Sequence, residues 1–171
     1  MKLIKLLSVL IFCCFTLVAK AQNSASTPAI EGYTSLSASF LRLGSYSKER
    51  PTFFIEQDFD YRFNDRVSLG LGLGFNLYPA LLAFPVALNG KYYFKINKRS
   101  FLFKQSIGRN IRLADIFFSS NRYLGSFAMQ IPLKQSALFP EVGYNFLWDR
   151  FGGKNVGFFL GISWKYTIKR M

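Results

Sequence analysis

The chain has 171 residues and carries 22 lysines and arginines against 9 aspartates and glutamates, for a formal net charge of +13. Its length accommodates one domain of ordinary size. It contains no histidine, which disfavours imidazole-dependent zinc sites and serine-hydrolase triads. The excess positive charge favours an anionic partner. Lipid phosphate fits better than nucleic acid, because the basic residues are scattered and no nucleic-acid-binding motif is present.

The first 21 residues have the three parts of a signal peptide. Met1–Lys5 carries two lysines, Leu6–Val18 is almost entirely apolar, and Ala19–Ala21 (Ala-Lys-Ala) is a small-x-small cleavage pattern. The apolar run is shorter than the about 20 residues that a transmembrane helix needs, so a retained anchor is the weaker alternative. Cleavage would remove both cysteines, and with them any thiolate metal site. We therefore expect a signal peptide over residues 1–21 and a mature domain over residues 22–171.

Eight segments of the mature chain alternate between apolar and polar residues with period two, which predicts β-strands. In chain order they are Gly32–Leu43, Phe53–Phe63, Val67–Leu77, Val86–Lys95, Phe101–Leu113, Tyr123–Leu133, Glu141–Asp149 and Phe158–Ile168. In the first segment the parity changes after Phe40, as a β-bulge would cause. In the sixth, Pro132 requires a position near the strand end.

The connections between these segments alternate in length. They are Gly44–Pro51, Asn64–Arg66, Tyr78–Pro85, Asn97–Ser100, Ala114–Arg122, Lys134–Ser136 and Arg150–Asn155, and they run long, short, long, short, long, short, long. Bacterial outer-membrane barrels combine an even strand number with short periplasmic turns and longer extracellular loops. The sequence therefore predicts an eight-stranded antiparallel up-and-down transmembrane β-barrel, with both termini in the periplasm.

The two faces of the predicted strands differ in composition. The polar face is rich in glycine, serine and charges of both signs, which suits the narrow interior of an eight-stranded barrel. The other face carries aromatic residues near both strand ends, as expected for the two girdles at membrane interfaces. On the turn side these are Tyr61, Phe63, Tyr92, Phe94, Phe101, Trp164 and Tyr166, and on the loop side Phe84, Tyr123, Phe146, Trp148 and Phe158. A soluble lipocalin-like barrel is the alternative.

With these features the chain resembles the small outer-membrane β-barrel family of Gram-negative bacteria, the OmpA/OmpX-like type. The resemblance spans Gly32 to Ile168 and includes the turn Phe63–Arg66, which leads into the alternating Ser68–Gly72 segment. It implies residence in the outer membrane, with barrel-insertion machinery and periplasmic chaperones as partners during biogenesis. The chain departs from the family pattern at its end, Tyr166–Met171, which lacks the usual final aromatic residue.

Three carboxylates, Glu56, Asp58 and Asp60, share one face of a predicted strand. Carboxylates this close could raise one another's pKa and perform acid–base chemistry. The favoured interpretation is structural, because a narrow barrel must neutralise its buried charges by pairing. We expect a lumen charge network in which these carboxylates pair with lysines, namely Lys91, Lys104 and Lys165, with Lys95 as a further candidate.

Gly70, Gly72 and Gly74 alternate with leucines in the third segment. This run is not a dinucleotide-binding fingerprint, because no helix follows it. We expect the glycines to leave room for bulky neighbours inside the barrel.

Five basic residues near the predicted loop-side rim are candidates for contacts with lipid phosphate: Arg109, Arg112, Arg122, Arg150 and Lys154. Arginine is favoured at such sites because its guanidinium makes forked contacts with phosphate oxygens. Outer-membrane lipid and lipopolysaccharide are the partners that this interpretation implies, with another envelope protein as a further possibility.

No catalytic, cofactor-binding or metal-binding residues are predicted. The function that the pattern favours is that of a non-enzymatic outer-membrane barrel with a packed, charge-paired lumen, acting through its loops in envelope integrity or in surface and partner interactions. The alternatives are a narrow pore for small solutes and, less favoured, a lipid-modifying enzyme.

Overall fold

The computed structural model describes residues 28–44, 52–78, 81–112, 120–148 and 154–170. In chain order their strands are β1 (Ala29–Gly44), β2 (Thr52–Arg62), β3 (Val67–Tyr78), β4 (Leu81–Ile96), β5 (Arg99–Arg112), β6 (Ser120–Met129), β7 (Ile131–Pro132), β8 (Ser136–Trp148) and β9 (Lys154–Arg170). Within these ranges there is no helix of the length and apolarity needed to cross a membrane.

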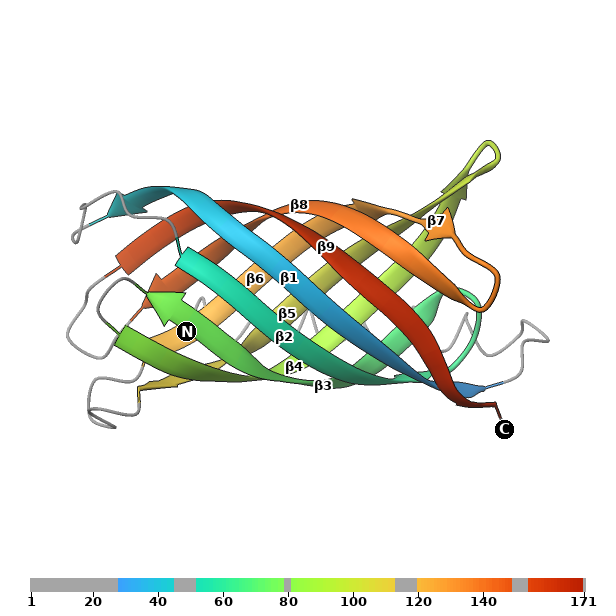
Figure 1. Ribbon diagram of the computed structural model, residues 1–171, viewed down its shortest axis with the longest axis horizontal. Helices are drawn as coiled ribbons and strands as arrows, with labels where there is room; N and C mark the ends of the chain where they lie inside the picture. The colour runs from blue at the N-terminus through green and yellow to red at the C-terminus, as the bar shows by residue number, and fades with distance from the viewer. Residues whose placement is uncertain (1–27, 45–51, 79–80, 113–119, 149–153, 171) are drawn as a thin grey trace, which may run out of the picture.

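The strands form one antiparallel sheet that closes on itself (Figure 1). Closure comes from the pairing of β1 with β9 and of β6 with β8. β7 continues β6 beyond Gln130 and also pairs with β8, so β6 and β7 together make one of eight barrel strands. The predicted eight-stranded antiparallel barrel is confirmed. The predicted bulge is confirmed too, because the β1–β9 register shifts between Ser39 and Leu41.

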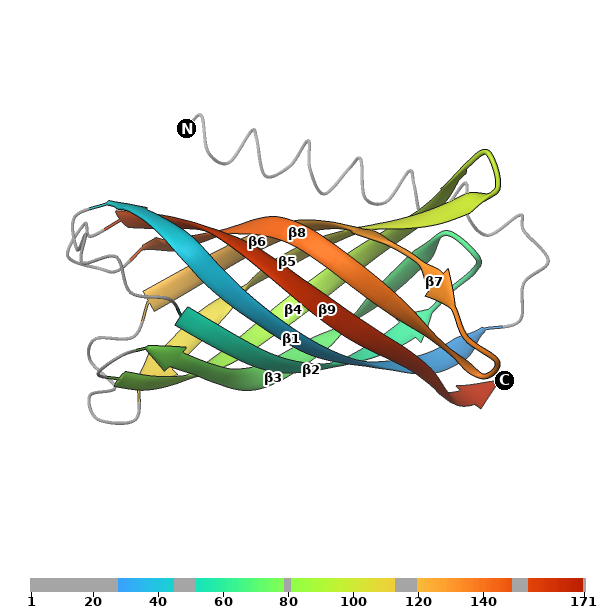
Figure 2. The same ribbon diagram turned by 45° about the horizontal axis from the view of Figure 1, so that its top comes forward.

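The barrel has two different ends, which we call the turn end and the loop end (Figures 1 and 2). The turn end contains the β2–β3, β4–β5 and β7–β8 connections. The beginning of β1 and the end of β9 lie there as well. The β4–β5 hairpin projects beyond its neighbours there. Its turn contains Asn97 in the left-handed region, at φ 55°, which asparagine tolerates better than most residues.

Two prolines lie inside strands, although the sequence predicts strand starts just after them. Proline lacks the amide hydrogen of the sheet ladder, so it needs a place where that bond is missing. The pairing of β4 with β3 is interrupted at Pro85, and the pairing of β8 with β6 and β7 is interrupted at Pro140. β4 therefore begins at Leu81, and the long connection Tyr78–Pro85 expected from the sequence is corrected, because Tyr78 belongs to β3 and residues 81–85 belong to β4.

Side chains alternate between the outside and the inside of the barrel. The outward positions carry large apolar side chains, and many of these are about half exposed, such as Leu71 at 55%, Leu88 at 63% and Leu160 at 56%. The inward positions carry serine, asparagine and charged side chains together with a smaller number of apolar ones. The division into two faces follows the predicted one.

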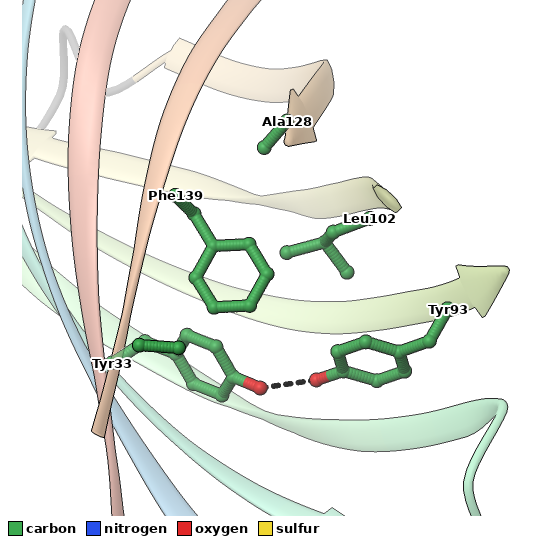
Figure 3. Packing of buried hydrophobic residues seen from close by; sticks show 6 residues of the cluster. Tyr33, Tyr93, Leu102, Ala128 and Phe139 are labelled. Carbon is green, nitrogen blue, oxygen red and sulfur yellow. Dashed lines mark hydrogen bonds between the residues drawn. The ribbon is translucent and has the colours of Figure 1, made fainter. Parts of the chain in front are cut away.

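An apolar cluster, which we call the lumen cluster, fills the interior near the turn end (Figure 3). Its members are Tyr33, Tyr93, Leu102, Ala128, Ala137 and Phe139. The hydroxyl groups of Tyr33 and Tyr93 meet in a hydrogen bond across the lumen. The ring of Phe139 lies 6.1 Å from that of Tyr33. Close-packed side chains of this kind leave little space for water.

Candidate functional site

The three carboxylates singled out in the sequence all point into the barrel. Glu56, Asp58 and Asp60 alternate along β2 with outward side chains, and their exposed fractions are 8%, 1% and 1%. A buried carboxylate is stable only if cations or hydrogen-bond donors surround it. The surroundings of this triad therefore decide what it does.

Two lysines on neighbouring strands supply most of the required donors. Lys91 on β4 places its Nζ 2.8 Å from Asp58 Oδ2 and 2.6 Å from Asp60 Oδ2. Lys104 on β5 places its Nζ 2.7 Å from Asp58 Oδ2 and 3.9 Å from Glu56 Oε2. Asp58 also accepts a hydrogen bond from Asn89 Nδ2 at 2.7 Å. Asp58 is thus the centre of the network, held by two ammonium groups and an amide.

The glycines of β3 make this arrangement possible. β3 lies between β2 and β4, and its residues opposite Asp60 and Asp58 are Gly70 and Gly72. A Cβ atom at Gly70 would lie 2.1 Å from Asp60 Oδ1, and one at Gly72 would lie 2.7 Å from Asp58 Oδ1. The carboxylates therefore reach across β3, over the space that a side chain would occupy, to the lysines beyond it.

An arginine that the sequence analysis assigned to the rim completes the network. Arg122 on β6 points inward, is 1% exposed, and forms an ion pair with Glu56 across the lumen. The result is a chain of alternating charges, which we call the charge ladder: Asp60, Lys91, Asp58, Lys104, Glu56 and Arg122. Lys91 also places its Nζ 3.6 Å from the centre of the Tyr33 ring, which connects the ladder to the lumen cluster.

Lys165 was expected to pair with the carboxylates of β2, but it binds a different carboxylate. Its Nζ lies 2.7 Å from Glu31 Oε1, and Arg62 Nη1 lies 3.0 Å from the same oxygen. The reason is the closure of the barrel, which sets β9 beside β1 and places Lys165 opposite Tyr33. Glu31, Arg62 and Lys165 form a second group near the turn end, which we call the Glu31 cluster.

One further buried acid has neutral partners. Glu141 on β8 accepts hydrogen bonds from Ser126 Oγ and Ser163 Oγ, each at 2.9 Å. Glu31, Arg62 and Glu141 were not among the residues predicted for the network. Parity would have identified Glu141, because it alternates with the apolar residues of its own segment.

Positive and negative charges are equal in number in the described interior. The acids are Glu31, Glu56, Asp58, Asp60 and Glu141, and the bases are Arg62, Lys91, Lys104, Arg122 and Lys165. A buried ion pair adds little net stability, because desolvation offsets its attraction. Loss of one partner is different, since it leaves a bare charge in a confined space. The interior is therefore arranged for mutual compensation.

The candidate rim residues are distributed differently from the expectation. Arg122 is corrected from the rim to the interior, because it shares the inward parity of Leu124 and Ser126 on β6. Arg109 and Lys154 are exposed near the loop end. The side chain of Arg112 and the whole of Arg150 lie outside the described residues. Lys95, the further candidate for the network, is exposed at the turn end.

The described residues contain no group of three or more histidine, cysteine, aspartate or glutamate side chains arranged to hold a metal ion. The carboxylates of the ladder are each shared with ammonium or guanidinium groups. A carboxylate held in this way acts as a counter-ion, and this is the chemical role that the geometry gives to the triad.

Comparison with known proteins gives a match at the level of the fold. No protein-family model matches the sequence, and no curated protein sequence matches it. The N-terminal β-barrel domain of Pseudomonas aeruginosa OprF is similar in structure, with a TM-score of 0.53 and 10% identity, over 82% of this chain and 98% of that one. Neisserial surface protein A and Ail of Yersinia pestis, each 11% identical, give TM-scores of 0.49 and 0.43 over 82% of this chain and 98% and 99% of theirs. The fold comparison rests on the OprF domain.

Proposed function

We propose that this eight-stranded barrel is an integral outer-membrane protein of a Gram-negative bacterium, exported by its N-terminal signal peptide. It acts without catalysis, through its loops and rims, in envelope integrity or in contacts with lipopolysaccharide or another envelope protein. The likeness of its fold to the OprF barrel domain is consistent with this assignment.

The observation that carries the proposal is the apolar outer wall. Large hydrophobic side chains are exposed on β1 to β9, among them Leu36, Ile55, Leu73, Leu88 and Leu160. A soluble protein rarely exposes a continuous apolar surface of more than a few hundred Å². In a bilayer the same wall faces hydrocarbon. The closed sheet leaves no strand with an unpaired backbone edge in contact with that hydrocarbon. The wall therefore favours a membrane over water.

Aromatic rings mark the two edges of this wall. Near the turn end, rings contact each other in the pairs Tyr61–Phe63, Tyr92–Phe94 and Trp164–Tyr166. Near the loop end, Phe146 contacts Trp148 and Phe75 contacts Phe84. Aromatic girdles of this kind lie at the level of the lipid headgroups. The two girdles lie at opposite ends of the strands, which supports a barrel that crosses one membrane from one headgroup layer to the other.

The interior supports a structural role more than transport. The lumen cluster and the charge ladder occupy successive levels of the barrel, and the ladder is 9% exposed or less throughout. An interior of eight strands has only enough width for its own side chains. We therefore expect the folded protein to conduct few ions.

A narrow pore is the second candidate, and one observation favours it. Several buried polar atoms toward the loop end have no hydrogen-bond partner among the described residues, including Arg122 Nε and Nη2 and the side-chain oxygens of Asn76 and Asn145. Buried polar atoms require water or another partner, so this section of the lumen is polar enough to be wet. Conduction would still require a path past Tyr33 and Tyr93.

The test is expression of the full chain with its leader, followed by membrane fractionation and electrophoresis with and without boiling. We expect the protein in the outer-membrane fraction, with a gel mobility that changes on boiling because the closed sheet resists detergent. Recovery as soluble periplasmic protein would overturn the proposal. Single-channel recording on the purified protein then separates the candidates: a silent bilayer supports the sealed barrel, and steady unitary currents support the pore.

A further inference from the structure

The mouth of the barrel at the turn end contains a polar cavity of about 630 Å³. The β2–β3 turn forms one wall, the ends of β4 and β5 form another, and Gln130 contributes from the β6–β7 junction. Tyr93, whose ring is buried in the lumen cluster, also lines it. Tyr92 and Phe94 line it as well, so the cavity, which we call the turn-end cup, lies against the end of β4. Its volume is within the range of small-molecule sites.

Cations dominate the charged lining of this cup. Arg62, Arg66 and Lys95 line it together with one carboxylate, Asp65, which gives a net charge of +2. Asp65 provides weak compensation, because its side chain is 77% exposed and its Oδ1 lies 3.9 Å from the nearest Arg62 nitrogen. A cavity with low-dielectric walls and a net charge concentrates ions of the opposite sign.

Two of the three cations have no ion-pair partner among the described residues. The Arg62 guanidinium binds Glu31 Oε1 at 3.0 Å and the backbone oxygen of Asn64 at 2.9 Å, so it forms part of the wall. Arg66 and Lys95, by contrast, form no ion pair with any other described residue and are exposed. Each has its donors available to a ligand.

Neutral donors lie beside these cations. Ser100 and Gln130 line the cup, and the backbone of Gln130 is fixed by a 2.8 Å hydrogen bond from its amide to Ser100 O. A ligand that uses two cations and neutral donors at once needs a double negative charge and several acceptor oxygens. A phosphate monoester has both, with a charge of about −1.5 to −2 and three acceptor oxygens. A single carboxylate would leave part of the positive charge unmatched.

From these observations we propose that the turn-end cup is a binding site for a phosphate monoester, in which Arg66 and Lys95 are the principal ligand-binding residues. The proposal goes beyond the proposed function, because it rests on the geometry of the mouth and not on which compartment the mouth faces. The monoester has two possible sources, a soluble phosphate ester and the headgroup of a lipid such as phosphatidic acid.

The test uses the full folded barrel in non-ionic detergent, with ³¹P NMR as the readout. One arm titrates glycerol 3-phosphate, and the other adds mixed micelles that contain phosphatidic acid, with phosphatidylcholine as the reference lipid. The variant is Arg66→Gln with Lys95→Gln. The matched control is Lys98→Gln with Arg99→Gln, which removes the same charge from the same end of the barrel but from residues outside the cup lining.

We expect the cup variant to bind at least about tenfold more weakly, the effect of losing one or two charge-assisted hydrogen bonds, and the control to stay within about twofold of the parent, as expected for screened surface charge. Loss confined to the first arm identifies a soluble ester, and loss confined to the second identifies a headgroup. Equal loss in variant and control, or no binding of either ligand by the parent, would overturn the proposal. Heat-modifiable gel mobility verifies folding, and the conservative Lys95→Arg variant should retain binding.

Discussion

The charge ladder and the Glu31 cluster use the same chemistry at different depths. In the ladder, Lys91, Asp58 and Asp60 have side chains that are at most 1% exposed. In the Glu31 cluster, the carboxylate is 4% exposed, but its partners Arg62 and Lys165 are 20% and 12% exposed. A charge that reaches water can be solvated when its partner is lost, and a charge in the ladder cannot. The same type of substitution should therefore have very different effects in the two regions.

The largest effect is expected for Asp58→Ala. This change leaves Lys91 and Lys104, whose side chains are 1% and 4% exposed, with one carboxylate each, which should lower the free energy of unfolding by about 3–5 kcal/mol. The measurement is urea unfolding of the refolded barrel in detergent micelles, followed by tryptophan fluorescence. A loss of less than about 1 kcal/mol would mean that water reaches this level of the lumen, which would favour the pore.

A smaller loss is expected for Gly72→Ala, which tests the path of the carboxylates across β3. The added Cβ would lie 2.6 Å from Asn89 Nδ2 and 2.7 Å from Asp58 Oδ1, and overpacking of this kind lowers stability by about 1–3 kcal/mol. The control is Gly90→Ala on the neighbouring strand. A Cβ there would meet only Leu69, at an ordinary 3.5 Å. Equal effects at the two glycines would contradict the proposed path.

For the Glu31 cluster we expect a loss of about 1 kcal/mol on Glu31→Ala, close to the value of an average hydrogen bond. Arg62 keeps its bond to the backbone of Asn64, and Lys165 turns toward the mouth and water. The same urea titration gives the comparison with Asp58→Ala. If the two substitutions are equally damaging, depth is not what separates the two regions.

The smallest effect on stability is expected at the exposed loop end, for Arg109→Gln combined with Lys154→Gln. Exposed charges contribute about 0–1 kcal/mol, so unfolding should change little. The amount of co-purifying lipopolysaccharide should fall, and more so at low salt, where exposed charges are less screened. The control is Lys134→Gln with Lys169→Gln at the turn end. Unchanged lipopolysaccharide would exclude the rim contact proposed for these two residues.

Alternation of side chains predicted most of the fold, because a barrel wall imposes period two on every strand. Val67–Leu77 is an example, since its predicted bounds match β3 within one residue. The largest errors in strand bounds came from prolines. Pro85 and Pro140 suggested strand starts. The strands continue past them because the pairing with the neighbouring strand is interrupted at each proline. Such gaps depend on the neighbouring strands, which one segment alone does not reveal.

The sequence predicted which side chains of a strand point inward, but it was less able to predict which partners they bind on other strands. The inward triad of β2 and its approach to Lys91 and Lys104 follow from parity and strand order. The choice of partner for Lys165 does not, because it depends on which strands meet when the barrel closes. Arg122 was misplaced for a different reason: it was treated as part of a loop, whereas it is the third residue of β6. The turn-end cup combines residues from three separate parts of the chain, and no single stretch of sequence contains its signal.

The seam between β1 and β9 has a consequence for assembly. The Ser35–Ser163 hydrogen bond across it joins residues 128 positions apart, and contacts between such distant residues form slowly. Asp58, Lys91 and Lys104 belong to strands that follow one another closely, so hairpins can bring them together while the sheet is still open. At that stage their charges face water and keep the growing inner surface hydrated. Zipping of the seam then encloses ladder charges that are already matched, and Lys165 gains its partner Glu31 in the same step, because that ion pair crosses the seam.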